Sequence, residues 1–470
     1  VTMLKRIGAE ENGEFKAVAS GTLPNGKPVI VNADGTVSVV STTTRSESVG
    51  TRVVFDNGHM DATSVTFDSN SNKVVVVWRD NNNSYYGTAA VGTVDPSDNS
   101  ITFGSDVVFE TANVRSGFAV AFDSTNNKVV IAYKDGGNSN YGTAIVGTVS
   151  GTSISFGTAV VFSSGVVSDM SIVDHTTAQK MVISYRDAVD NHKSKSIVGT
   201  VSGTSISFGS ATAFSSAYGY FPDSTYDSTN DKIVLVWTHI NDSSKGKAAV
   251  GTVSGTSISF GDEVTFHSGT TGEFNQVSFD PTSGKVVVAY VDDGDSNKGK
   301  ALVGTVSGTS ISFGSEAIFH NAATYRNSLV YDPTSNKTLI AYSDASSSNG
   351  GTFVMATVSG TSISFGSEAV FEAGEAANIS TTYDSNNDRV VIIYEDATDS
   401  DQGSAVVVST AASTINLTSE NYIGMSRGFA SPATSGSKVT FESGTMGSEH
   451  IGVVYDPDVG RIILAYQDES

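Results

Sequence analysis

A twelve-residue motif, VGTVSGTSISFG, recurs along the chain and constrains its fold more than any other feature. Copies occupy Val146–Gly157, Val198–Gly209, Val250–Gly261 and Val303–Gly314, and variants begin at Val91 and Ala356. A second pattern follows each motif: an aromatic residue and Asp, a polar turn, Lys or Arg, and an apolar run that ends in aromatic-x-Asp. Its first Asp falls at Asp68, Asp123, Asp174, Asp227, Asp280, Asp332, Asp384 and Asp456. These copies are 51 to 55 residues apart except for a last step of 72, so one unit is repeated eight times.

Each repeat is predicted to consist of β-strands. Lys128–Tyr133 is a β-branched run of the kind that forms a strand buried on both faces. Thr152–Phe156 alternates polar and apolar residues, as in a half-exposed strand. Ser150-Gly151 and the segment Asp280–Gly284 are turn sequences. Each repeat is therefore predicted to be a four-stranded antiparallel meander, with Trp78 and Trp237 at equivalent core positions.

A period of about 52 residues with four strands per unit predicts an all-β fold, a β-propeller with one blade per repeat. Tight hairpins disfavour a linear β-solenoid, whose strands are parallel. The eighth repeat ends after two strands, and residues 28–40 have the strand, turn and strand layout of the missing pair. We therefore predict eight blades, with this N-terminal hairpin completing the C-terminal blade. Seven blades with a separate terminal hairpin is the alternative.

Two segments fall outside the repeat pattern. Residues 1–26 are predicted to be an N-terminal arm or linker, and residues 414–438 are a polar insertion between the last two repeats. The propeller is accordingly predicted to span residues 27–470 and to contain this insertion.

Composition excludes several classes of function. The formal net charge of −22 repels phosphate backbones and anionic membrane surfaces, so neither nucleic-acid binding nor membrane insertion is expected. No apolar run approaches the roughly 20 residues that cross a bilayer. The chain has no cysteine, hence neither disulfides nor thiolate metal sites. Because only 16% of its residues are charged, the surface must be covered largely by Ser, Thr, Asn and Gly.

The variable loops predict which face of the propeller has a function. Loops between the second and third strands, such as Asn81–Tyr86, differ among repeats, and so do those that lead into the next repeat, such as Ser215–Pro222. Both sets of loops must lie on one face of a meander. That face is either a recognition face or a face whose loop sequences are free to vary. Aromatic rings in such loops are typical anchors for sugars or pockets. The predicted ligand-binding residues are Tyr85, Tyr86, Tyr141, Tyr218, Tyr220, Phe221 and Tyr325. The alternative is that these rings pack against neighbouring loops.

Acidic residues near these loops allow a structural and a metal-binding interpretation. The Asp that ends each aromatic-x-Asp is interpreted as a turn residue that accepts backbone N–H bonds. Two loops also gather oxygen ligands suited to a hard cation such as Ca²⁺, although neither has EF-hand spacing. The candidate metal ligands are Asp293, Asp295, Asn297, Asp396, Asp399 and Asp401. Solvated acidic loops without a bound ion are the default interpretation, so no cofactor is expected.

Catalytic motifs are absent from the sequence. It contains no nucleophile elbow, no His-Glu-x-x-His and no phosphate-binding glycine loop. A carboxylate pair that cleaves glycosidic bonds remains an alternative, because its spacing is spatial rather than sequential. We therefore expect a non-enzymatic protein with no catalytic residues.

The repeats, together with Ser20–Val37 and Leu417–Gly424, resemble repetitive virion proteins of marine tailed bacteriophages such as cyanophages. The resemblance implies a tail-fibre, appendage or capsid-surface protein at the virion surface, outside the cell. We expect the protein to recognise the host by binding a surface glycan or receptor. Other virion proteins are its expected partners, and a homo-oligomer of this chain is a further alternative. A structural decoration or connector protein is the first alternative, and a polysaccharide-degrading enzyme is the second.

Overall fold

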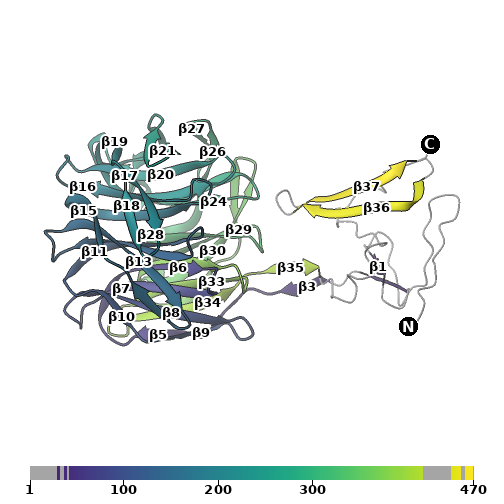
Figure 1. Cartoon of the computed structure of the whole chain (residues 1–470), viewed down its shortest axis with the longest axis horizontal. Helices are drawn as coiled ribbons and strands as arrows, with labels where there is room; N and C mark the ends of the chain where they lie inside the picture. The colour runs from purple at the N-terminus through teal and green to yellow at the C-terminus, as the bar shows by residue number, and fades with distance from the viewer. Residues whose placement is uncertain (1–28, 32–35, 40–41, 416–445, 457–460, 469–470) are drawn as a thin grey trace. The chain divides into compact units, whose positions relative to one another are not determined.

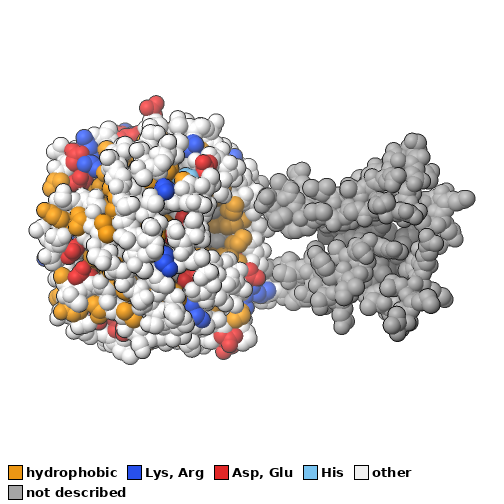
Figure 2. Space-filling view, in the orientation of Figure 1, with side chains coloured by type: hydrophobic (Ala, Val, Ile, Leu, Met, Phe, Trp, Pro, Cys, Tyr) orange, Lys and Arg blue, Asp and Glu red, His pale blue; other side chains and the backbone are white. Residues whose placement is uncertain are grey.

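The computed structural model describes residues 29–31, 36–39, 42–415, 446–456 and 461–468 of the chain. The chain divides into two compact units, one made of residues 47–410 and the other of residues 1–46 with 411–470. In the described part, no helix is long and apolar enough to span a membrane. Figure 2 shows that uncharged polar side chains and backbone cover most of the visible face of the larger unit, as its composition predicts.

Residues 47–410 form seven antiparallel sheets of one plan, numbered here sheet 1 to sheet 7. Shared strands join sheets 2 to 4, and likewise sheets 5 to 7, into a continuous 13-stranded sheet. Their first strands are β6 (Met60–Asp68), β11 (Val114–Asp123), β15 (Val160–His175), β19 (Thr212–Asp227), β24 (Gln276–Asp280), β28 (Ala317–Asp332) and β32 (Ala369–Asp384). The second strands are β7 (Lys73–Asp80), β12 (Lys128–Asp135), β16 (Lys180–Asp187), β20 (Lys232–His239), β25 (Lys285–Asp292), β29 (Lys337–Asp344) and β33 (Arg389–Asp396). The third strands are β8 (Tyr86–Asp95), β13 (Tyr141–Ser150), β17 (Lys193–Ser202), β21 (Lys245–Ser254), β26 (Lys298–Ser307), β30 (Gly350–Ser359) and β34 (Gln402–Ser409).

The fourth position of each sheet is divided between two short segments that pair with the third strand. In sheets 1 to 6 the first segment is β9 (Ser100–Phe103), β14 (Ser153–Phe156), β18 (Ser205–Phe208), β22 (Ser257–Phe260), β27 (Ser310–Phe313) or β31 (Ser362–Phe365). The second segment is β10 (Val107–Glu110) in sheet 1 and β23 (Val264–Thr270) in sheet 4. In sheets 2, 3, 5 and 6 it is the start of the next sheet's first strand, so β15, β19, β28 and β32 each join two sheets.

The seven first strands contact one another in a closed cycle. Contacts run from β6 through β11, β15, β19, β24, β28 and β32 and return to β6. Sheet 7 is completed by the N-terminal strands β4 (Ser48–Val49) and β5 (Val53–Asp56), which pair with β34. Figure 1 shows β5 and β34, which come from opposite ends of residues 47–410, both in the lower part of the larger unit.

Within the part of the chain that the structure describes, the closed cycle contains seven sheets, and the predicted eighth blade stays a prediction. The predicted hairpin gives β1 (Val29–Val31) and β2 (Val37–Val39), and the eighth repeat gives β36 (Met446–Asp456) and β37 (Arg461–Asp468). Among the described residues these are two separate two-stranded sheets rather than one shared blade. The physical reason is that the seventh repeat lacks the SISFG segment, and Val49–Phe55 supplies its fourth strand instead. This segment has the same Gly and Val-Val-Phe spacing as Phe103–Phe109.

The smaller unit contains one further strand pair, β3 (Thr42–Arg45) with β35 (Ala412–Ile415). The predicted arm at residues 1–26 lies outside the described residues, as does the predicted insertion beyond residue 415.

The core lies between neighbouring sheets, as the strand patterns predict. The second strand of sheet 1 is fully buried from Val74 to Trp78, and Trp237 is equally buried in sheet 4. Side chains of Val75 and Val77 pack against Ile131 of sheet 2. Removing each such side chain from water contributes about 1.5–3 kcal/mol to folding, so the ring is stabilised at every interface between sheets.

Candidate functional site

Each first strand, or in sheet 5 the segment just before it, has a residue with a positive φ angle at the equivalent place. The φ angle is positive at Ala62, Gly117, Asp169, Phe221, Phe274, Arg326 and Asn378, which are 52 to 55 residues apart. Six of these positions coincide with a register shift against the second strand, which marks a β-bulge. A left-handed residue other than glycine costs about 1–3 kcal/mol and is found most often at functional sites. Six residue types occupy these seven positions, with Phe at both 221 and 274, so the surface here varies from sheet to sheet.

The middle residue of aromatic-x-Asp, at the end of each second strand, lies close to these bulges. It is Arg79, Lys134, Arg186, Thr238, Val291, Ser343 or Glu395 in sheets 1 to 7. In sheets 3 and 4 its side chain reaches the next sheet: Arg186 donates to Tyr218 Oη at 2.9 Å, and Thr238 Oγ1 lies 2.9 Å from Thr271 Oγ1. This residue therefore decides what fills the interface between one sheet and the next.

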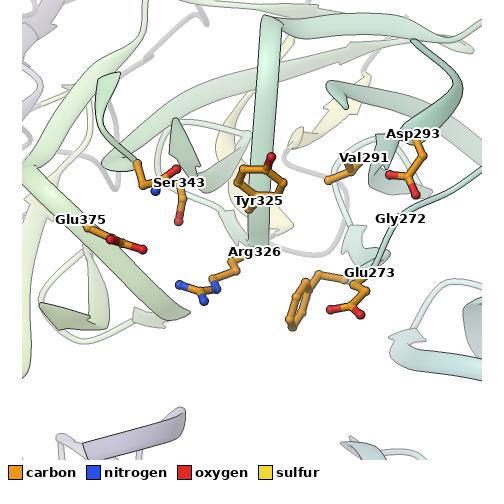
Figure 3. Close-up of a pocket in the computed structure, with 10 residues that line it drawn as sticks. Gly272, Glu273, Val291, Asp293, Tyr325, Arg326, Ser343 and Glu375 are labelled. Carbon is orange, nitrogen blue, oxygen red and sulfur yellow. The ribbon is translucent and has the colours of Figure 1, made fainter. Parts of the chain in front are cut away.

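A cavity of about 370 Å³ opens where this middle residue is small, at Val291 and Ser343. The volume is within the range of small-molecule sites. The cavity is lined by Gly272, Glu273, Phe274, Val291, Asp293, Tyr325, Arg326, Ser343, Asn349 and Glu375. Figure 3 shows Arg326 between Glu375 on one side and Glu273 on the other, with Tyr325 next to it. These residues come from both sets of loops that the sequence predicts on one face.

Charges around the cavity interact with one another. Burial raises the pKa of Glu273, and the charges of Asp169 and Asp293 raise it further, whereas Arg326 opposes the shift. Burial also raises the pKa of Asp293. The Arg326 guanidinium makes no ion pair with any described residue, although its side chain lies among carboxylates. It therefore keeps hydrogen-bond donors for a bound molecule.

Burial raises the pKa of Glu395, at the end of the second strand of sheet 7, to about 7. The hydrogen bond from Asn378 and the charge of Arg326 oppose this shift, while Asp401 and Asp61 add to it. Glu395 lies on the same face as the cavity, so this face contains a carboxyl group that titrates near neutral pH.

A row of aromatic rings continues from the cavity across sheets 5, 4 and 3. Phe274 stacks on Phe221 with ring centroids 4.8 Å apart, and Phe221 lies 4.2 Å from Tyr220. Arg186 lies over the rings of Tyr220 and Tyr218, at 4.9 and 5.4 Å from their centroids. These rings are half-buried, so each keeps part of its surface accessible.

The structure brings together only part of the predicted aromatic set. Tyr325 lines the cavity, and Tyr218, Tyr220 and Phe221 belong to the aromatic row. The remaining three lie elsewhere: Tyr85, beneath the guanidinium of Arg79, and Tyr86 in sheet 1, and Tyr141 in sheet 2.

The predicted metal ligands are engaged mainly with cations of the protein. Asp295 pairs with Lys298 and Lys300 at 3.0 and 3.1 Å. Asp396 and Asp399 both pair with Arg52.

The remaining three members of the set have different contacts. Asp293 lines the cavity, Asp401 lies 3.7 Å from His59, and the backbone oxygen of Asn297 accepts from Thr324. Across the described ranges, no cluster of three His, Asp or Glu side chains could hold a metal ion. Ca²⁺ therefore stays a prediction without structural support.

The interpretation of the Asp residues that end the second strands is confirmed where the structure describes their side chains. Asp80 Oδ1 accepts from the backbone N–H of Asn82 and Asn83, both at 3.0 Å. Asp292 accepts from Gly294 at 3.0 Å, and in sheet 4 His239 takes the same role by accepting from Asp242. Asp292 thereby holds one of the loops that border the cavity.

Sequence reasoning missed several cavity residues, namely Glu273, Phe274, Arg326, Ser343, Asn349 and Glu375. Two signals were present in the repeats. The middle residue of aromatic-x-Asp varies between fixed neighbours, and so does the bulge position 52 to 55 residues apart. Variation at a single position within an otherwise constant unit marks a residue that packing does not dictate.

Comparisons with known proteins give a likeness in fold. No family model matches the chain, and no curated protein sequence matches it. The structure is similar to the crystal structure of the BP39L lectin from Burkholderia pseudomallei, with a TM-score of 0.56 and 8% identity. The match covers 77% of this chain and 98% of the lectin. The chain therefore has an all-β fold of antiparallel sheets that is shared with a lectin structure.

Proposed function

We propose that residues 47–410 are a seven-bladed β-propeller that binds a glycan in the cavity beside Tyr325 and Arg326. The closed cycle of first strands supports the propeller. The single observation that carries the binding function is a cavity that combines two aromatic rings, Phe274 and Tyr325, with convergent polar side chains. The lectin fold of the structural neighbour supports the same class of ligand.

The geometry suits a sugar for a physical reason. A pyranose ring has an apolar face that stacks on aromatic rings, and its hydroxyls need both donors and acceptors. Phe274 and Tyr325 supply rings, Arg326 and Asn349 supply donors, and Glu273 and Glu375 supply acceptors. Loop ends fixed by Asp292 and Asp344 hold these groups in place before binding, which lowers the entropic cost of association.

The resemblance to phage virion proteins extends the proposal to the biological setting. A glycan-binding propeller on a tail fibre or appendage would attach the particle to its host, and many weak sites would act together through avidity. Mass spectrometry of purified particles that encode this chain tests this part. If the chain is absent from the particles, a virion role is contradicted, whereas glycan binding is tested separately.

Retention of the purified protein on immobilised surface polysaccharides tests the binding site. We expect Tyr325→Ala to weaken retention at least tenfold, because it removes a ring of the cavity. Val291→Arg should do the same, because sheet 3 has an arginine at this position and its side chain would fill the space. Tyr85→Ala is the matched control, since Tyr85 and Tyr325 are both 44% exposed. Equal retention of all three variants and the wild type would contradict the proposed site.

Cleavage of the glycan is a second candidate function, favoured by the three carboxylates of the cavity, Glu273, Asp293 and Glu375. The chain length of the polysaccharide after incubation distinguishes the two functions. We expect unchanged length with retention, and shortening that is lost on Glu375→Gln would establish an enzyme.

A further inference from the structure

Sheet 2 places two cations side by side on the face that contains the cavity. Arg115 of β11 and Lys134 of β12 are direct cross-strand partners. Opposite residues in an antiparallel pair have Cβ atoms about 4.5–5.5 Å apart, and like charges there are destabilising. Neither side chain makes an ion pair or hydrogen bond with another described residue. The chain has 22 more acidic than basic residues, so an unpaired cation pair runs against its composition.

The equivalent pair in sheet 1 has opposite charges. Asp61 and Arg79 are cross-strand partners at the same register position and form a salt bridge. Other lysines of this face are also neutralised: Lys195 lies 2.9 Å from Asp187, and Lys300 lies 2.6 Å from Asp292. Sheet 2 therefore departs from sheets 1, 3 and 5, where Arg79, Lys195 and Lys300 each pair with an acid.

The carboxylate of Asp169, which favours the charged form of Lys134, does not neutralise the pair. Asp169 of sheet 3 accepts from Arg186 Nε at 2.6 Å, so Arg186 already uses it. Burial lowers the pKa of Lys134, the charges of Arg115 and Arg186 lower it further, and Asp169 only partly opposes them. The bulge residue here is Gly117, so the bulge position adds no side chain beside the two cations.

We propose that Arg115 and Lys134 bind a sulfate or carboxylate group of an acidic glycan. This inference rests on the proposed function and specifies its ligand, because the aromatic row leads from the cavity to Arg186, which neighbours Lys134. The cavity would hold one sugar, the row would stack on the chain, and the cation pair would bind an anionic group farther along. Arg115 offers a fork of donors that fits either oxyanion.

The test compares binding of dextran sulfate, carboxymethyl dextran and uncharged dextran of equal length. Arg115→Asp recreates the sheet 1 salt bridge, so we expect a higher Tm together with at least tenfold weaker binding of one or both anionic polymers. Lys134→Gln should also weaken binding. The control Lys128→Gln/Lys232→Gln changes net charge by the same −2 as Arg115→Asp but alters the opposite ends of the strands, and we expect it to bind like the wild type.

Three results would overturn the inference: no binding of either anionic polymer by the wild type, unchanged binding by Arg115→Asp, or an equal loss in the control. Tyr325→Ala separates this inference from the proposed function. If it binds every polysaccharide like the wild type while Arg115→Asp does not, the cavity proposal fails and the anion site stands. The reverse result supports the cavity and removes the anion site.

Discussion

A Cβ atom at Gly157 of sheet 2 would lie under 3.0 Å from the backbone oxygen of Thr204 in the hairpin turn of sheet 3. The same relationship joins Gly50, Gly104, Gly209, Gly261 and Gly314 to the turn of the next sheet. The glycine that ends VGTVSGTSISFG is therefore a contact between sheets. Gly366 of sheet 6 is the exception, with no atom closer than 3.6 Å, because sheet 7 has no such turn.

This difference predicts opposite outcomes for one substitution at two equivalent positions. Gly157→Ala should lower the free energy of unfolding by about 1–3 kcal/mol, since a backbone atom blocks the methyl group and the sheets must separate. Gly366→Ala should change it by less than about 0.5 kcal/mol. Urea unfolding followed by circular dichroism measures both, and equal effects would show that the glycines serve another purpose.

A buried asparagine provides the second prediction. Asn275 donates to Thr238 Oγ1 at 2.7 Å. Its equivalent is Asn327, whose side chain finds no hydrogen-bond partner among the described residues, and Val291 stands at the position equivalent to Thr238. Val291→Thr should supply that partner and leave stability unchanged or raise it by about 1 kcal/mol. Val288→Thr, in the core of the same strand, should lower stability by about 1–3 kcal/mol because its hydroxyl is buried alone. A similar loss of stability in both variants would contradict the equivalence of Asn327 with Asn275.

The left-handed backbone of Arg326 predicts an inverted preference for glycine. Glycine within a strand is normally about 0.5–1 kcal/mol less stable than alanine. At Arg326, where φ is 57°, Arg326→Gly should instead be about 1 kcal/mol more stable than Arg326→Ala, because glycine relieves the strain. Both variants should lose glycan retention at least tenfold. Thermal unfolding with retention measures this, and a more stable alanine variant would argue against strain.

Glu395 predicts a pH dependence of stability. Burial raises its pKa in the folded state from 4.5 to about 7, so the folded state binds the proton more tightly than the unfolded state. The resulting stabilisation is complete below pH 4.5 and is lost as the pH rises through 7. After allowance for solvent screening it is on the order of 1 kcal/mol. Wild type should therefore lose stability relative to Glu395→Gln between pH 5 and pH 8. If the urea midpoints of the wild type and Glu395→Gln differ by the same amount at pH 5 and at pH 8, the raised pKa of Glu395 is disproved.

The sequence alone determined the repeating unit and its strands. Local patterns suffice for this, because Lys128–Tyr133 is apolar on both faces and Asp80 binds the backbone of its own loop. The sequence also determined that the variable loops share one face, because consecutive connections of a meander lie alternately at its two ends.

Only the tertiary structure decided the number of sheets and the place of the cavity. The seventh sheet is completed by Val53–Asp56, from the other end of the ring, and pairing between distant segments depends on the cost of loop closure and on core packing around Phe55. The cavity arises because Val291 leaves unfilled a space that Arg186 fills in sheet 3. Whether a side chain fills an interface depends on the sheet opposite it, which the periodicity of a single repeat does not encode.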